Sequence, residues 1–165
     1  MVTEPLDEDA FRRAFGRFAT GVAVVTCIHG GLDRAMTANA VSSVSLDPPL
    51  ILVCVDVESR FHEAIIGTSR WGLSVLTAPG RAAARWLATK GRPLQGQLDV
   101  VPHHRGPKTG VALLDDALAT FECTTVAVHP AGDHSIVVGH VLGLALGDGE
   151  AAALTFYRGA FGSLR

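Results

Sequence analysis

The alternation of apolar and polar positions along the chain is typical of strands more often than of helices. Runs rich in β-branched residues cover 22–28 and 50–57, the second apolar enough for a strand buried on both faces, and a further strand is expected over 71–76. In the last third, strands are expected almost without interruption, over 117–128, 135–146 and 153–157. Because tight turns join several of these strands, the pattern predicts a mainly β fold, a closed antiparallel barrel with a few helices at its rim.

The N-terminal pattern is helical. Asp7 can cap a helix that places Phe11, Phe15 and Phe18 on one face, and this helix is expected to end near Thr20. Arg12, Arg13 and Arg17 lie largely off this apolar face, so the helix is expected to be amphipathic.

The middle of the chain adds a hairpin and two short helices. The Gly30-Gly31 turn joins the first strand to a second one expected over 34–38. Ser59 can cap a helix over 61–66, and the Ala- and Arg-rich stretch 81–89 predicts another. Residues 90–110 follow without periodicity, so we expect a long surface excursion of the kind that is often functional or forms an interface.

Length and charge narrow the range of functions. The 165 residues predict one domain over 1–165, and the 48% content of hydrophobic residues suggests that part of the surface lies in a subunit interface. The formal charge of −2, without a run of Lys or Arg, argues against binding to nucleic acid. No apolar stretch reaches the ~20 residues that cross a membrane, and the acidic N-terminus lacks a signal core, so a cytoplasmic protein is expected.

Several common sites are missing from the sequence. The three cysteines are far apart and embedded in β-type runs, so we expect reduced thiols rather than disulfides or a zinc site. His103 and His104 are adjacent and have no further ligand nearby, so no metal is expected. The glycine pattern of a dinucleotide fold, the phosphate loop of nucleotide hydrolases and the serine motif of α/β-hydrolases are absent.

The segment between Thr37 and Ser45 is the most unusual stretch of the chain. Five hydroxyl or amide side chains gather here beside an apolar strand, in a chain otherwise dominated by Val, Leu and Ala. Such neutral donors suit a planar, phosphorylated ligand with polar edges, and a flavin has those properties. The same composition is also that of an ordinary polar loop, and the residues alone leave both interpretations open.

Four ordered blocks give the chain a resemblance that covers nearly its whole length. It resembles the flavin reductase-like proteins of the FMN-binding split-barrel fold, in particular the reductase components of two-component flavin-dependent monooxygenases. The blocks are Phe18-Ala19-Thr20-Gly21-Val22-Ala23-Val24-Val25-Thr26, the segment 36–49 with its Ser-x-Asp-Pro-Pro ending, Cys54-Val55-Asp56 with Ser59, and Gly132-Asp133-His134-Ser135-Ile136-Val137-Val138-Gly139.

The resemblance implies a homodimer of Greek-key antiparallel split β-barrels with a few peripheral helices and a flavin near the subunit interface. It places His134 close to the nicotinamide, as the residue on which catalysis depends. Arg60 and Arg81 adjoin expected helix starts, where each could pair with a phosphate or lie in solvent. The predicted flavin-binding residues are Met36, Thr37, Ala38, Asn39, Ser43, Val44, Ser45, Cys54, Val55, Asp56, Ser59, Arg60 and Arg81.

The implied activity is that of an NAD(P)H:flavin oxidoreductase. Hydride would pass from nicotinamide C4 to flavin N5, and the reduced FMN or FAD would supply a partner monooxygenase. A flavin-binding electron carrier or storage protein is the alternative, and the Gly-Asp-His block favours the enzyme. The sequence leaves open the choice between FMN and FAD and between NADH and NADPH.

Overall fold

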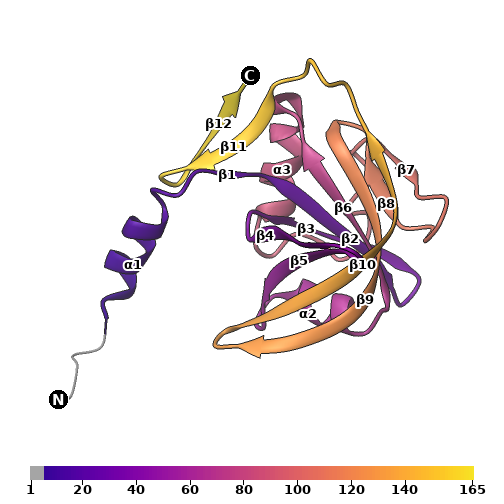
Figure 1. The fold of residues 1–165 in the computed structure, drawn as a ribbon, viewed down its shortest axis with the longest axis horizontal. Helices are drawn as coiled ribbons and strands as arrows, with labels where there is room; N and C mark the ends of the chain where they lie inside the picture. The colour runs from indigo at the N-terminus through magenta and orange to yellow at the C-terminus, as the bar shows by residue number, and fades with distance from the viewer. Residues whose placement is uncertain (1–5) are drawn as a thin grey trace.

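A curled seven-stranded antiparallel sheet forms the body of the computed structural model, which describes residues 6–165 (Figure 1). Its strands, in spatial order, are β3 (Leu32–Ala38), β2 (Ala23–His29), β6 (Arg70–Leu76), β9 (Ala117–Ala131), β10 (His134–Leu146), β5 (Pro49–Asp56) and β4 (Val41–Leu46). The mainly β fold with an antiparallel barrel-like sheet is therefore confirmed.

The expectation of a closed barrel is wrong. β3 and β4 are the two edges of the sheet, and no ladder joins them within the described residues. The chain passes directly from one edge to the other through Asn39 and Ala40, and the Cys54 amide donates to the Ala40 carbonyl at 2.9 Å. Because β4 pairs only with β5, the barrel stays split along this line, and the split exposes the residues on either side of it.

Two small sheets complete the β structure. One joins β1 (Thr20–Gly21), β11 (Ala153–Tyr157) and β12 (Ala160–Leu164), and the other joins β7 (His103–Arg105) to β8 (Ala112–Leu114). The sequence analysis did not expect β7, β8 or β12, since strands this short show no clear periodicity. Residues 90–110 also prove to be more than a surface excursion, because they bury Gln97, Leu98 and Val101.

The expected helix starts are confirmed by their caps. The carboxylate of Asp7 accepts from two backbone amides of the first turn of α1 (Glu8–Phe15), and the hydroxyl of Ser59 accepts from Phe61 in α2 (Arg60–Ile66). The third helix, α3 (Arg81–Ala88), follows a short 3₁₀ turn, η1 (Ala78–Gly80). No helix within residues 6–165 is long and apolar enough to span a membrane.

The first helix ends earlier than expected. Gly16 follows its last turn, and residues 20–21 pair with β11 instead of continuing the helix. α1 buries none of its residues and projects from the sheet, as Figure 1 shows.

The strand β5 alternates in burial, so the expectation that both of its faces are buried is wrong. Ile51, Val53 and Val55 face the core around the fully buried Trp71, while the residues between them are only half-buried. On the other face of β5, Leu52 and Cys54 line a cavity.

Candidate functional site

Two cavities adjoin along β3 and β5. Thr37 lines one of them and the next residue, Ala38, lines the other; β5 likewise presents Asp56 to the first and Cys54 to the second. We call the first the cationic cavity and the second the apolar cavity. Since consecutive residues border both, an elongated ligand can lie across the boundary between them.

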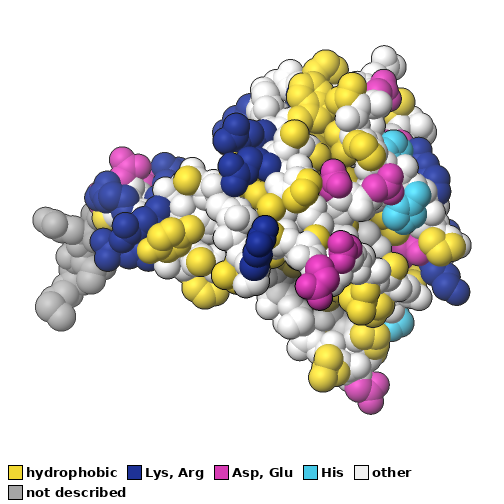
Figure 2. Space-filling model, turned by 90° about the horizontal axis from the view of Figure 1, so that it is seen from above, with side chains coloured by type: hydrophobic (Ala, Val, Ile, Leu, Met, Phe, Trp, Pro, Cys, Tyr) yellow, Lys and Arg dark blue, Asp and Glu magenta, His cyan; other side chains and the backbone are white. Residues whose placement is uncertain are grey.

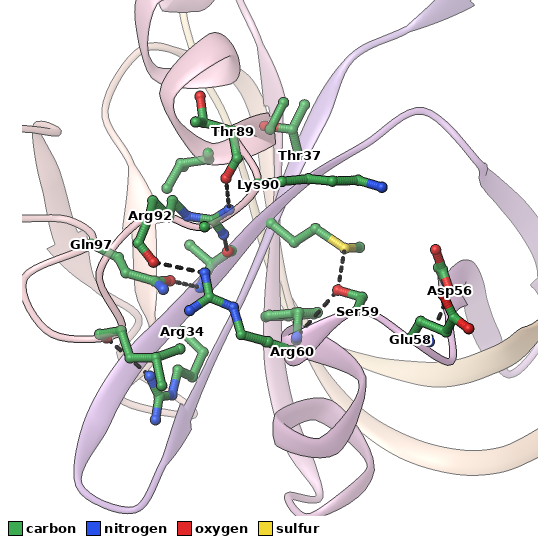
Figure 3. Close-up of a pocket in the computed structure, with 17 residues that line it drawn as sticks. Arg34, Thr37, Asp56, Glu58, Ser59, Arg60, Thr89, Lys90, Arg92 and Gln97 are labelled. Atoms are coloured by element: carbon green, nitrogen blue, oxygen red, sulfur yellow. Dashed lines mark hydrogen bonds between the residues drawn. The ribbon is translucent and has the colours of Figure 1, made fainter.

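The cationic cavity has a volume of about 400 Å³ and lies between β3, the start of α2, the end of α3 and the segment that follows α3 (Figure 3). Its walls carry four cations and two carboxylates, and no ion pair joins them in the part of the chain that the structure describes. The charged residues are Arg34, Arg60, Lys90, Arg92, Asp56 and Glu58.

Arg92 is the most unusual of these cations. Burial and the nearby charge of Arg60 both lower the pKa of its guanidinium. Its terminal nitrogens donate to the carbonyls of Thr89 and Ala35, but Nε is buried without a partner. Arg60 in turn donates to the Arg92 carbonyl at 2.7 Å. The two guanidiniums carry like charges close together, so a phosphate bound between them would stabilise both.

The polar side chains at the mouth of this cavity come from segments predicted to bind flavin. The Ser59 hydroxyl lies 3.8 Å from the sulfur of Met36, and the Thr37 hydroxyl donates to the Ala84 carbonyl of α3 at 2.7 Å. Asp56 accepts from the Glu58 amide at 2.8 Å, which fixes the turn that leads into α2. The two strand ends and α2 are thereby held in one arrangement.

The apolar cavity is larger, about 940 Å³, and lies between the barrel and the projecting α1. Phe11, Phe15 and Phe18 line its outer side, and Leu52 and Cys54 of β5 line the side toward the sheet. Burial raises the pKa of the Cys54 thiol. Such a mostly apolar space, with few polar groups, suits planar ring systems.

His134 stands at the edge of the apolar cavity, at the first position of β10. Its side chain is 41% exposed, and Nδ1 lies 2.7 Å from the carboxylate of Asp133. This hydrogen bond lowers the pKa of Asp133. Because Asp133 holds the ring through Nδ1, Nε2 is left for a ligand in the cavity.

The structure brings most of the predicted site residues to these cavities. Met36, Thr37, Asp56, Ser59 and Arg60 line the cationic cavity, while Ala38, Asn39, Cys54 and His134 line the apolar one.

Five predicted residues lie elsewhere. Val55 is fully buried in the core, and Arg81 points away, donating to the Phe161 carbonyl at 3.4 Å. The remaining three, Ser43, Val44 and Ser45, lie on edge strand β4 outside both cavities. The split of the barrel explains this, because β4 leaves the cavity at Ser42 and continues along the free edge.

The sequence analysis missed the residues after α3. Lys90, Arg92 and Gln97 line the cationic cavity together with Arg34 of β3. Two basic residues around Gly91 in an aperiodic segment were the only available signal, and nothing in the sequence says which strand they contact. The histidines of the same region lie apart, since His104 binds Asp115 at 2.7 Å; residues 6–165 hold no cluster of three metal-ligating side chains.

Comparison with known proteins decides the family. The model of the family described as "Flavin reductase like domain" matches residues 15–165. The chain belongs to the flavin reductase-like family. This confirms the resemblance seen in the sequence, together with the split-barrel fold and the enzyme class of NAD(P)H:flavin oxidoreductase.

Three relatives of this flavin reductase-like chain illustrate the match. BorF, the flavin reductase component of a bacterial two-component tryptophan halogenase, is 43% identical and covers 96% of this chain and 98% of its own, with a TM-score of 0.90. The NADH:FAD oxidoreductase SgcE6 of Streptomyces globisporus, solved with NAD and FAD fragments, is 34% identical. The match covers 100% of this chain and 97% of SgcE6, with a TM-score of 0.90. The reductase component of a 4-nitrophenol 4-monooxygenase/4-nitrocatechol 2-monooxygenase of Rhodococcus opacus is 36% identical over 98% of this chain and 83% of its own.

Proposed function

We propose that this chain is an NADH-dependent flavin reductase that passes reduced flavin to a partner monooxygenase. The observation that carries the proposal is the junction of the two cavities along β3 and β5: the larger one is mostly apolar, and the smaller one is cationic. A flavin has this same division between a planar ring system and a phosphorylated tail.

The cationic cavity holds the phosphate. Lys90, Arg60 and Arg92 supply the cations that line this cavity, and Ser59 adds a hydroxyl. Charge-assisted hydrogen bonds of this kind are roughly twice as strong as neutral ones. Met36, Thr37 and Asp56 line the passage towards the apolar cavity.

The apolar cavity holds the rings. When bound there, the flavin supplies N5 as the acceptor for hydride from nicotinamide C4. Ala38, Asn39 and Cys54 border the sheet side of this space, and the phenylalanines of α1 help to exclude water. His134, oriented by Asp133, can hold the nicotinamide carboxamide through Nε2, and this role needs no proton transfer.

The relatives of this chain support the choice of cofactor and partner. SgcE6 is an NADH:FAD oxidoreductase, and the Rhodococcus relative is a reductase component of a monooxygenase. We therefore assign NADH as the hydride donor here, and a flavin-dependent monooxygenase as the consumer of the reduced flavin. A cytoplasmic location, where NADH is available, stays a prediction.

A homodimer is part of the same proposal. Phe11, Phe15 and Phe18 are 56%, 62% and 66% exposed, and each ring lies about 6 Å from its neighbour. Figure 2 shows apolar side chains open to solvent on the projecting N-terminal segment. A second copy that covers this stripe would also close the outer side of the apolar cavity, so association and water exclusion are linked.

Steady-state oxidation of NADH with added flavin tests the proposal. The purified protein should consume NADH only when FAD or FMN is present, and NADPH should serve as the weaker donor. A protein that binds flavin but leaves NADH unoxidised would instead be an electron carrier or storage module.

A further inference from the structure

The cations of the cationic cavity lie in a row rather than around a single point. Figure 3 shows Lys90 at the end near Thr37, Arg60 and Arg92 in the middle, and Arg34 at the opposite end. The row leads away from the boundary with the apolar cavity, where Thr37 is followed by Ala38. A phosphate monoester can occupy only one position along it.

We propose that this row recognises the diphosphate and the adenosine of FAD, so that the chain selects FAD over FMN. The inference rests on the proposed function and names the flavin that the site takes. The phosphate next to the ribityl chain lies at Lys90 and Ser59, the second phosphate lies between Arg60 and Arg92, and the adenosine lies at Arg34.

The far end of the row has the chemistry of a nucleoside site. A terminal N–H of Arg34 donates to the backbone carbonyl of Leu94 at 2.9 Å, which fixes its planar group at this end, and Leu94 itself is 39% exposed. A guanidinium plane stacks on aromatic rings, and an adenine is such a ring. FMN lacks the second phosphate and the adenosine that would occupy this end.

The segment that builds this end is held rigidly. Gln97 is buried; its side-chain oxygen accepts from the Ala35 amide at 3.1 Å, and its side-chain nitrogen donates to the Pro93 carbonyl at 3.0 Å. Trp86 donates to the Gln97 carbonyl at 2.8 Å. Since these bonds tie the segment to β3 and α3, the site exists before the ligand arrives and loses little entropy on binding.

Paired variants test this selection. The values of kcat/KM with saturating NADH are measured for FAD, FMN and riboflavin, and dissociation constants are measured by quenching of flavin fluorescence. For the wild type we expect kcat/KM for FAD to exceed that for FMN by about tenfold or more, the effect of one extra charged contact. Arg34→Met should lower kcat/KM for FAD much more than kcat/KM for FMN. Lys90→Met should lower kcat/KM for both of these flavins and leave the value for riboflavin little changed.

The control is Arg70→Met, which removes an exposed cation of β6 outside both cavities and should alter none of these values. Equal kcat/KM values for FAD and FMN in the wild type would overturn the FAD assignment, as would an equal loss of kcat/KM for both flavins in Arg34→Met. Neither result would contradict the proposed reductase function. If no flavin supports NADH oxidation, the proposed function fails; the dissociation constants still decide whether the row prefers FAD.

Discussion

His134 lies directly opposite Asp56 in the ladder between β10 and β5. The first residue borders the apolar cavity and the second borders the cationic cavity, so one pair of strand positions joins the two parts of the site. The Val57 amide reinforces this junction by donating to the Asp133 carbonyl at 3.0 Å. Backbone pairing therefore holds the two ends of the site in one arrangement.

Replacing His134 tests its role at the nicotinamide end. His134→Ala should lower kcat/KM for NADH by roughly 10- to 100-fold, the cost of one hydrogen bond in a closed site, while flavin affinity changes little. Stopped-flow measurement of flavin reduction separates this step from flavin binding. Equal losses in flavin affinity and reduction rate would contradict a role confined to NADH.

The companion variant Asp133→Asn tests the orientation of the ring. Because the His134 hydrogen bond lowers the pKa of Asp133, this contact is present above the ordinary carboxyl pKa and is lost only as the pH falls through the lowered value. We therefore expect the wild-type rate to show no inflection from Asp133 between about pH 5 and 8. The variant should raise KM for NADH across this range, with less effect than His134→Ala.

The sequence predicted the local features of this fold well. Asp7 and Ser59 cap the helices where expected, because a cap depends on neighbours within three positions. The cationic cavity depends on distant contacts, such as that between Arg92 and Ala35, which are 57 positions apart. The pattern of apolar and polar residues along the sequence does not predict a contact between residues so far apart. The displacement of Ser43 from the site has the same origin, since it follows from where the barrel splits.

The apolar stripe of α1 gives a prediction about assembly. Phe15→Ser removes the central one of the three neighbouring phenylalanine rings, so it should weaken self-association by at least tenfold, as expected from losing ~1.5–3 kcal/mol of apolar burial. Sedimentation velocity over a concentration series measures the change. Arg13→Ser, on the same exposed helix, is the matched control. A variant as dimeric as the wild type would show that α1 lies outside the interface.

The three cysteines should differ in reactivity. Burial raises the pKa of Cys27 and Cys123 to about 12, so at pH 8 only about one thiol in ten thousand is the reactive thiolate. Cys54 is half-buried and borders the apolar cavity. Mass spectrometry after treatment with iodoacetamide should find Cys54 modified first, and FAD should protect it. Labelling of Cys54 that FAD does not slow would place the rings elsewhere.

Glu122 should contribute strongly to stability although it lies outside the site. Its side chain is buried, and one carboxylate oxygen accepts from the Lys108 amide, the Thr109 amide and the Thr109 hydroxyl at 2.6–2.9 Å. Glu122→Gln can still offer its one carbonyl oxygen to these donors but removes the charge that strengthens all three hydrogen bonds, so we expect a loss of about 1–3 kcal/mol in the free energy of unfolding. Thr109→Val removes only one donor, so it should lower the free energy of unfolding by less than Glu122→Gln does. Equal losses in the two variants would argue against the carboxylate as the centre of the cluster.

Gly139 is required by the ring of Trp71. A Cβ on this residue of β10 would overlap Cζ2 of Trp71, which is fully buried in the core on β6. Gly139→Ala therefore forces the ring or the strand to move, and the free energy of unfolding should fall by about 1–3 kcal/mol, or about 2–4 °C in Tm for each kcal/mol. Gly149→Ala is the control, because nothing lies within 4 Å of its Cβ position. Urea unfolding of both variants measures the difference, and equal stability would mean that the core around Trp71 yields without cost.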